Sequence, residues 1–474
     1  MYLMNKKINI WFYIIILILP LFLSVNLKFY FEFIAISLFI KYSTSFLLKN
    51  SKLDNNIYLI KDIIQLVYSL IILLVCSYSF TPENILDTSS LIGDSSRYYE
   101  EALNFESLNE DALSILQFRN YTTNNYFFYQ VILSKIFPYF EYKILAGILF
   151  SAFIGIINFV LLNIIITKLT INKKINYYFS ILYLISPHVI ASSTYLYKDN
   201  LVVLAFILIL YGVIEFTLDT SKLIKGFILI FTGLILTFAV RLPYIYLYIS
   251  LSALIYWYCR KNNKFSFKSI ILFCTLIILI FSLYSASNYS TDRLSGDSIF
   301  YDYDYHRSRL VEDSTLYGSG ITSRLVGDYA SSSKLKQFIY LPVVTFVQYM
   351  NPINIHQFNY ENPWYFVEIN CKIIWLFITG PLFLFTCLNF KVHNIFVKML
   401  ILISALGYII IAHIQTGIVP RYALPFIVIA LIPCAFNYPL LKHYLIKPKY
   451  RNFQLCYYVP FITVYIIFVV RDLI

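Results

Sequence analysis

Two adjacent charged residues, Lys198 and Asp199, separate two long apolar segments of the sequence. The segment before them reads NYYFSILYLISPHVIASSTYL, and the segment after them begins LVVLAFILILYG. A lysine ammonium beside the start of a helix is a favourable partner for a phosphate. The pair therefore predicts either one side of a phosphate-binding site or a polar turn, in which Asp199 caps the next helix and Lys198 reaches the membrane interface.

Two arginines occupy similar places at the ends of other apolar segments. Arg241 stands in FAVRLPYIYLY and Arg421 in IVPRYALPF, each close to a Leu-Pro pair. An ionisable side chain at this depth is costly and marks a candidate functional site, although an arginine at a helix end also snorkels to the interface. We expect Lys198, Arg241 and Arg421 to cluster as an anion-binding site. Candidate supporting residues lie in the neighbouring sequence: His188, His413 and Tyr422.

Carboxylates suited to act as a general base occur in the two longest polar regions. Asp94 lies in LIGDSSRYYEEAL, where it or the next residue also fits the cap of an amphipathic helix, and Arg97 follows one turn later. Glu368, in NPWYFVEINCK, is either a second acid or an ordinary residue at a helix start. The Asp302-Tyr-Asp304 pattern is only a weak metal signal, so no metal and no other cofactor is expected.

The composition is that of a membrane protein. Of the 474 residues 59% are hydrophobic and 13% are charged, with a mean hydropathy of +0.70, whereas soluble domains are about 25% charged. Apolar segments that match a hydrocarbon core of about 30 Å follow one another. We predict an all-α, polytopic integral membrane protein with about 12–13 transmembrane helices and two long outer loop regions.

The basic residues predict the orientation of these helices. Lysines and arginines recur in alternate loops, starting with Lys6 and Lys7, which places the N-terminus and the basic loops in the cytoplasm. The net charge of +12 thus reflects membrane topology and does not indicate a nucleic-acid partner. The seven cysteines are scattered singly, which supports neither a disulfide framework nor a zinc site.

This topology divides the chain into five regions. They are N-terminal helices (1–80), a first outer loop (81–141), central helices (142–286), a second outer region with a short interfacial or re-entrant helix at 338–350 (287–371), and C-terminal helices (372–474). The predicted membrane helices cover 9–27, 29–48, 62–80, 142–167, 176–195, 199–218, 225–241, 243–259, 269–286, 372–390, 396–414, 421–441 and 455–471.

Several function classes are disfavoured by what the sequence lacks. It contains no Walker loop, no Ser-His-Asp order, no HExxH and no Cys/His cluster, which argues against ATP-driven transport and metallohydrolysis. The sequence has only 13 glycines and no visible internal repeat. Both observations argue against a transporter, because transporters commonly use broken helices and repeats. Few ionisable residues lie in mid-helix, Lys41 being the clearest.

Three short motifs resemble a set of polytopic proteins from bacterial surface-polysaccharide loci. They are an outer-loop "GD…Y…A" (Gly93, Asp94, Tyr98 or Tyr99, Ala102), a "P…KD" hairpin (Pro187, Lys198, Asp199) and a late "RYxLP" (Arg421, Tyr422, Leu424, Pro425). The sequence is similar in these motifs to Wzy-type O-antigen polymerases and to GT-C-class membrane glycosyltransferases. In many GT-C enzymes the catalytic loop follows the first helix, whereas here it follows the third, which favours the polymerase.

The resemblance implies an enzyme of the bacterial inner membrane whose active face is periplasmic. Its substrate would be a glycan linked to undecaprenyl phosphate or diphosphate, and its partners other membrane proteins of polysaccharide assembly. The basic outer turns would hold the phosphates, and Asp94, or else Glu368, would deprotonate the acceptor hydroxyl. The alternatives are a GT-C enzyme that adds a single sugar and, from another class, a flippase for lipid-linked oligosaccharides.

Overall fold

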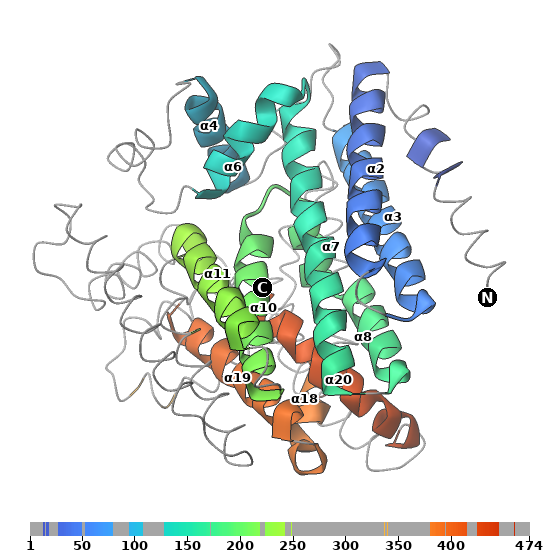
Figure 1. The fold of residues 1–474 in the computed structure, drawn as a ribbon, viewed down its shortest axis with the longest axis vertical. Coiled ribbons are helices and arrows are strands. Elements are labelled where there is room, and N and C mark those ends of the chain that lie inside the picture. The colour runs from blue at the N-terminus through green and yellow to red at the C-terminus, as the bar shows by residue number, and fades with distance from the viewer. Residues whose placement is uncertain are drawn as a thin grey trace, which may run out of the picture. The chain divides into compact units, whose positions relative to one another are not determined.

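The computed structural model describes about half of the chain, and all the regular elements in that half are helices (Figure 1). The molecule divides into two compact units. The first comprises Met1–Phe265 and Gln357–Cys371, and the second comprises Ser266–His356 and Lys372–Ile474. The described residues are 13–14, 16–18, 27–49, 53–78, 94–107, 128–170, 172–218, 223–241, 248, 336, 339, 380–393, 395–414, 424–444 and 459.

The first unit holds most of the described helices. In chain order they are α2 (Leu27–Lys49), α3 (Asn55–Tyr78), α4 (Asp94–Ser107), α6 (Phe128–Ile136) with the short η3 (Phe137–Tyr139), α7 (Lys143–Leu169), α8 (Lys173–Ile185), α9 (Pro187–Ser193), α10 (Asp199–Leu218) and α11 (Leu223–Arg241). Among the described helices, α2, α3, α7 and α11 contain segments long and apolar enough to cross a membrane. These observations support the predicted all-α membrane class.

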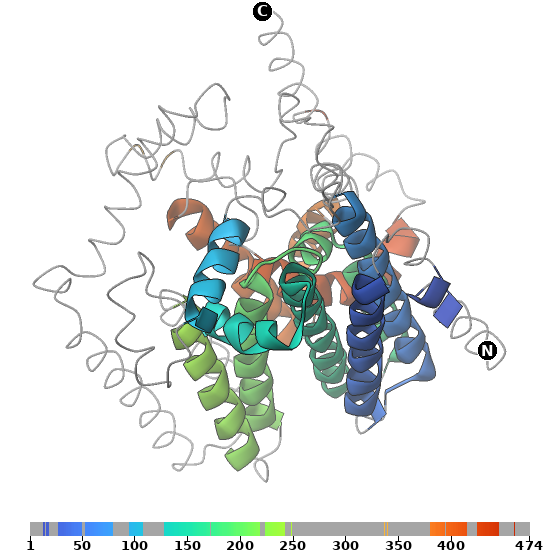
Figure 2. The ribbon, with the colours of Figure 1, turned by 90° about the horizontal axis from the view of Figure 1, so that it is seen from above.

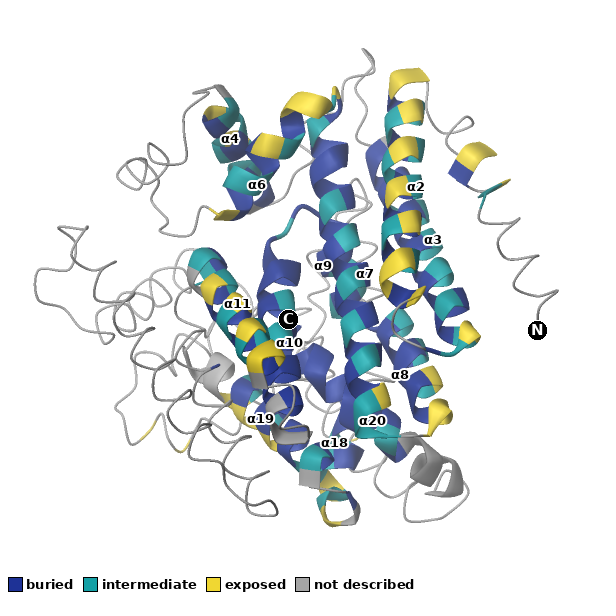
Figure 3. Ribbon diagram, viewed as in Figure 1, coloured by how far each residue is buried: buried dark blue, intermediate teal, exposed yellow. Residues whose placement is uncertain are grey.

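Helix α7 forms the centre of the first unit. It packs against α2, α3, α8, α9 and α10, and most of its surface is buried (Figure 3). A helix that is apolar on every side belongs in such a surrounded position. Helix α2, in contrast, leaves one face exposed, with Phe31, Phe39 and Phe46 on it. In a membrane this face is suited to contact acyl chains.

Polar contacts define two opposite ends of the first unit. At one end the Glu32 carboxylate of α2 accepts hydrogen bonds from the backbone N–H groups of Glu141 and Tyr142, just before α7. We call this the α4 end, because α4 and α6 lie there, across the start of α10 and the end of α11 (Figures 1 and 2). At the other end Lys173 of α8 lies 3.7 Å from Asp54, just before α3. We call it the lysine end.

A second group of charged side chains lies at the lysine end. The Glu215 carboxylate of α10 is buried and lies 2.9 Å from the ammonium groups of both Lys168, near the end of α7, and Lys225, near the start of α11. The three helix termini are thereby held together. The helices of the first unit thus run up and down between an end rich in lysine and an end covered by α4 and α6.

The described part of the second unit consists of three helices and one short 3-10 turn. In chain order they are α18 (Gly380–Leu388), the turn η8 (Phe390–Val392), α19 (Ile395–Ile414) and α20 (Leu424–Tyr444). Helix α20 packs against both α18 and α19. Buried polar side chains bridge two of these helices, since Asn437 donates to the Thr386 hydroxyl at 3.2 Å. The predicted helix at 396–414 is present as α19, which begins one residue earlier, and the one at 421–441 is present as α20, with both ends three residues later.

Two predicted helices have wrong bounds, one because polar residues stand inside a helix and the other because a proline divides it. Helix α3 begins at Asn55 and not at 62, so Lys61, which precedes the predicted start, is a buried helical residue. The helix predicted at 176–195 is two helices, α8 and α9, that break at Ser186 before Pro187. Proline fits the first turn of a helix but cannot donate the backbone hydrogen bond that would continue the preceding one.

Other predicted elements fall wholly or mostly outside the described residues. These are the membrane helices at 9–27, 243–259, 269–286 and 455–471, the whole of the second outer region at 287–371 apart from two residues, and its short apolar stretch at 338–350. The helix expected after Gly93 and Asp94 in the first outer loop is present as α4.

Candidate functional site

An ion pair joins the start of α10 to the end of α11. The Arg241 guanidinium donates to the Asp199 carboxylate at 3.3 Å, and the two side chains are 13% and 4% exposed. Asp199 is the first residue of α10, and the Lys198 carbonyl accepts the first backbone hydrogen bonds of that helix. Asp199, at the first position of α10, is thus paired with an arginine 42 positions away.

Glycines allow α10 and α11 to come close enough for this pair. A Cβ atom on Gly212 of α10 would lie 2.6 Å from the Gly226 carbonyl oxygen of α11. A Cβ atom on Gly233 of α11 would lie 2.7 Å from the Ala205 carbonyl oxygen of α10. Small residues at helix contacts permit such close backbone approach within membranes. Three of the 13 glycines of the sequence thus lie along the contact between α10 and α11.

The Lys198 side chain lies beneath α4. It is buried, and its ammonium is 5.3 Å from the centre of the Tyr98 ring. The ring of Tyr98 is in turn in edge contact with Tyr129 of α6, at 5.7 Å between centres. A cation over an aromatic face is stabilised by the ring quadrupole. Helices α4 and α6 therefore supply the aromatic surroundings of Lys198.

The irregular segment 194–198 between α9 and α10 is almost entirely buried. The Ser95 hydroxyl of α4 donates to the Leu196 carbonyl at 3.1 Å, and the Ser151 hydroxyl of α7 donates to the Tyr197 carbonyl at 3.3 Å. Non-helical backbone at membrane depth requires partners of this kind. The predicted polar turn is therefore part of the protein interior at the α4 end.

Asn200 connects three helices behind this segment. Its amide nitrogen donates to the backbone oxygens of Ser151 and Ser192, at 3.0 and 3.1 Å, and its side-chain oxygen accepts from the Ser192 hydroxyl. Its own backbone carbonyl accepts from Asn158 of α7 at 3.0 Å. The residue links α7, α9 and α10, and so fixes the positions of the two charged residues that precede it.

Tyr129 stands between α4, α7 and the ion pair. Its hydroxyl lies 3.0 Å from the Ser151 hydroxyl. Burial raises the pKa of the Tyr129 phenol well above its ordinary value, the Ser151 hydrogen bond opposes this effect, and the Asp199 carboxylate adds to it. Tyr129 is therefore a neutral hydrogen-bonding group at physiological pH and is not suited to act as a base.

Two carboxylates of α4, those of Glu101 and Glu106, have partners of their own. Arg97 lies 3.6 Å from Glu101 on the same helix, and Glu101 accepts a hydrogen bond from Gln130 of α6 at 2.7 Å. Glu106 pairs with Lys143 at the start of α7 at 2.7 Å. Arg97, predicted to bind phosphate, is thus in contact with Glu101. Asp94 is the first residue of α4, and its side chain lies outside the description.

The structure brings together only part of the predicted site. Asp199 and Arg241 form an ion pair at the α4 end, and Lys198, the residue before Asp199, lies there against the Tyr98 ring. We call these three residues the cluster. His188 lies in α9, close to them in the chain. His413 lies in α19 of the second unit, where the structure describes its backbone but not its side chain. Three predicted residues lie outside the described residues: Glu368, Arg421 and Tyr422.

Sequence reasoning missed the residues that support the cluster. Ser95, Tyr129, Ser151 and Asn200 carry no motif, and their only signal is that each is a polar group in or beside an apolar stretch. Across the described residues no group of three His, Cys, Asp or Glu side chains converges as a metal site. The arrangement is suited to bind an anion with one lysine and one arginine, the latter oriented by a carboxylate.

Comparisons with known proteins identify no relative. No protein-family model matches this chain, and neither a curated protein nor a solved structure matches it significantly. The functional argument therefore rests on the residues of this chain.

Proposed function

We propose that this protein is a polymerase of the bacterial inner membrane, which joins undecaprenyl-diphosphate-linked repeat units of O-antigen or a related surface polysaccharide. In this proposal the α4 end faces the periplasm, because the opposite end carries the lysines that the positive-inside rule assigns to the cytoplasm. The observation that carries the proposal is the Asp199–Arg241 ion pair at that end, next in the chain to Lys198, whose ammonium lies against the Tyr98 ring.

The cluster supports a role in binding the leaving diphosphate. Lys198 and Arg241 together carry two positive charges, and Asp199 orients the guanidinium while offsetting one of them. Loss of a polyprenyl diphosphate during transfer concentrates negative charge on the leaving oxygen, and a preorganised cation lowers the energy of that state. The aromatic rings of Tyr98 and Tyr129 limit access of water to the lysine, which strengthens its interaction with phosphate.

The acceptor hydroxyl needs a base, and the proposal assigns this role to Asp94, with Glu368 as second candidate. Asp94 begins the helix whose next residue, Ser95, contacts the segment before Lys198. In the reaction the acceptor oxygen would form a bond to the anomeric carbon, the bond from that carbon to the diphosphate would break, and the base would take the hydroxyl proton. No cofactor is required.

The first test is the surface-glycan profile of the native host after deletion of the gene. A polymerase predicts loss of the ladder of chain lengths, with a single repeat unit still attached to its anchor. The Arg241→Met and Lys198→Met variants should reproduce this loss. Lys173→Met, which removes an exposed lysine at the lysine end, is the matched control and should retain the ladder.

Other outcomes point to the alternatives. A ladder with altered spacing between rungs would indicate a transferase that adds a single sugar. Complete loss of surface glycan, with repeat units accumulating on the cytoplasmic leaflet, would indicate a flippase. An unchanged ladder would refute a role in this polysaccharide.

A further inference from the structure

Two lysines from different helices share one buried carboxylate at the lysine end. The Glu215 side chain of α10 is 1% exposed, and its Oε1 atom lies 2.9 Å from the ammonium of Lys168 on α7 and 2.9 Å from that of Lys225 on α11. Because both ammonium groups contact the same oxygen, their separation is at most twice that distance. The group therefore holds two neighbouring positive charges against one negative charge.

Tyr211, one turn before Glu215 on α10, completes this group. The centre of its ring lies 5.5 Å from the Lys168 ammonium and 5.0 Å from the Lys225 ammonium. Its hydroxyl accepts a hydrogen bond from Lys225 at 3.1 Å. An aromatic ring attracts cations but carries no charge that would neutralise them. Tyr211 thus holds the two ammonium groups in place and leaves the excess positive charge unchanged.

Both ammonium groups have hydrogen-bond donors left for a further acceptor. An ammonium group carries three N–H donors. Within the described part of the chain, Glu215 accepts from Lys168, whereas Glu215 and Tyr211 accept from Lys225. These contacts leave at least one donor on each lysine. The two side chains are 28% and 51% exposed, so a ligand can reach them from outside the helices.

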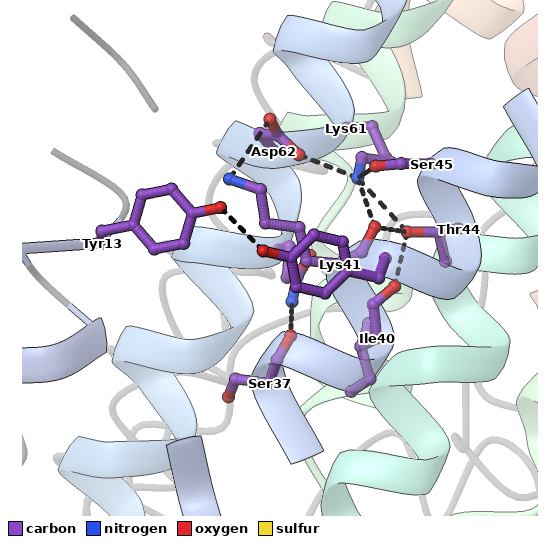
Figure 4. A network of polar contacts seen from close by, with 10 residues as sticks. Tyr13, Ser37, Ile40, Lys41, Thr44, Ser45, Lys61 and Asp62 are labelled. Carbon is purple, nitrogen blue, oxygen red and sulfur yellow. Dashed lines mark hydrogen bonds and ion pairs between the residues drawn. The ribbon is translucent and has the colours of Figure 1, made fainter. Parts of the chain in front are cut away.

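A second charged group, between α2 and α3, shows the contrasting arrangement (Figure 4). The Lys61 side chain is 0% exposed, and its ammonium lies 2.8 Å from the Asp62 carboxylate. The same ammonium donates to the Ser45 hydroxyl at 2.9 Å and to the Thr44 hydroxyl at 3.2 Å. Each of its three donors thus has an acceptor inside the protein. That group joins two helices, whereas the group around Glu215 is open to the outside.

The group around Glu215 lies at the level of the lipid headgroups. Helix α7 has 27 residues and is therefore about 40 Å long, close to the thickness of a bilayer with its headgroup layers. Lys168 is the residue before the last one of α7. Lys225 is the third residue of α11, and Glu215 precedes the last residue of α10 by three. All three side chains are thus placed where lipid phosphates lie.

We infer that Lys168 and Lys225 together bind the phosphate of an anionic phospholipid from the leaflet at the lysine end. Two oxygens of one phosphate can each accept from one ammonium, and charge-assisted hydrogen bonds of this kind are strong. One phosphodiester also carries the single negative charge that makes the group neutral, with Glu215 holding both lysines in position.

An apolar stripe beside Lys225 favours a lipid over a soluble phosphate. Residues three and four positions apart lie on the same face of a helix. Along α11 the exposed isoleucines follow this spacing from the position next to Lys225 towards the middle of the helix; they are Ile224, Ile228 and Ile235. This stripe is suited to contact the acyl chains of a lipid whose phosphate is bound at Lys225.

This inference does not depend on the proposed glycan chemistry, because the group lies at the opposite end of the unit from the Asp199–Arg241 pair. The experiment uses the purified full-length protein in phosphatidylcholine nanodiscs with increasing fractions of phosphatidylglycerol. The thermal unfolding midpoint is measured at each composition for the wild type, Lys168→Met, Lys225→Met and Lys173→Met. Lys173 is the matched control, because it is 80% exposed and lies 3.7 Å from Asp54 at the same end.

Phosphatidylglycerol should raise the midpoint of the wild type and of Lys173→Met along the same curve. Lys168→Met and Lys225→Met should each need about tenfold more of this lipid for half of the shift, because each loses a charge-assisted hydrogen bond. Glu215 keeps one lysine partner in either variant. Curves that coincide with that of Lys173→Met would overturn the inference. An equal shift by glycerol 1-phosphate in pure phosphatidylcholine would overturn the assignment to a lipid.

Two further variants keep both positive charges and cover the case in which the methionine variants do not fold. Lys225→Arg should follow the wild-type curve, because a guanidinium also binds phosphate. Glu215→Gln raises the net charge of the group and should lower the fraction of phosphatidylglycerol needed severalfold. If Glu215→Gln follows the wild-type curve, or if the wild-type midpoint does not change with phosphatidylglycerol, no lipid phosphate binds at this group.

Discussion

The Arg241 guanidinium, at the end of α11, lies 3.3 Å from the Asp199 carboxylate at the start of α10. The two residues are brought together because α10 and α11 pack antiparallel along glycine contacts. Since Asp199 offsets the charge of Arg241, Lys198 contributes most of the net positive charge of the cluster. Pairing also keeps the guanidinium in one orientation, which a flexible surface arginine lacks.

Removing one member of the Asp199–Arg241 pair should lower the free energy of unfolding more than replacing both members with apolar residues. Asp199→Asn and Arg241→Met should each destabilise the protein by about 3–5 kcal/mol, because each leaves a buried charge without its partner. The double variant Asp199→Leu/Arg241→Met should recover most of this loss, although glycan polymerisation should remain absent. Denaturant unfolding in detergent micelles measures the stabilities. A double variant as unstable as the sum of the singles would show that the two side chains do not act as a pair.

The aromatic contact of Lys198 should depend on the ring of Tyr98 and not on its hydroxyl. Tyr98→Phe keeps a ring face under the ammonium and should leave polymer length near that of the wild type. Tyr98→Leu removes the ring and about 0.5–2 kcal/mol of cation–π stabilisation. Its activity should fall severalfold in the ladder assay at equal protein level. Equal activity of the leucine and phenylalanine variants would remove Tyr98 from the site.

Alanine at the glycines between α10 and α11 should separate these helices. In Gly212→Ala or Gly233→Ala the new methyl group meets a backbone carbonyl of the facing helix, which cannot move aside as a side chain would. We expect a loss of about 1–3 kcal/mol in unfolding free energy together with reduced activity. Ile235→Ala, on the exposed face of α11, is the control and should change the unfolding free energy and the activity little. Wild-type activity in both glycine variants would contradict the role of this contact.

The second unit should lose stability in acid partly through His393. Burial lowers the pKa of this imidazole below its usual 6.5, and the Lys398 ammonium adds to the effect. The unfolded chain therefore binds a proton at higher pH than the folded chain, and stability falls as the pH drops through 6.5. His393→Gln should show a smaller loss of thermal stability between about pH 7 and pH 5. Parallel curves for the variant and the wild type would exclude this contribution.

Hydropathy predicted much of the helical framework. The boundaries of α10 agree with the prediction, and those of α2, α7 and α11 agree within two residues, because long apolar segments leave few alternatives in a membrane. The start of α3 could not be found in this way. Lys61 and Asp62 interrupt the apolar pattern, and only their partners on α2, Thr44 and Lys41, show that they belong inside the helix.

The charged residues of the candidate site could be selected from sequence, but their partners could not. Lys198, Asp199 and Arg241 stand out because charge is rare at the ends of apolar segments. Nothing in the sequence indicates that Tyr98 lies over Lys198, or that Ser95 contacts the Leu196 carbonyl 101 positions later. Such contacts depend on how α4 folds back onto the helices that follow it.

The sequence by itself determined that this is a helical membrane protein, and that charge is concentrated at a few helix ends, because composition and segment length depend on no contact between distant residues. Only the tertiary structure decided which of these charges meet. It joined Asp199 to Arg241 across 42 positions, and placed Lys41 and Lys61 on either side of Asp62. These pairings follow from the close packing of neighbouring helices, which brings together residues that hydropathy treats independently.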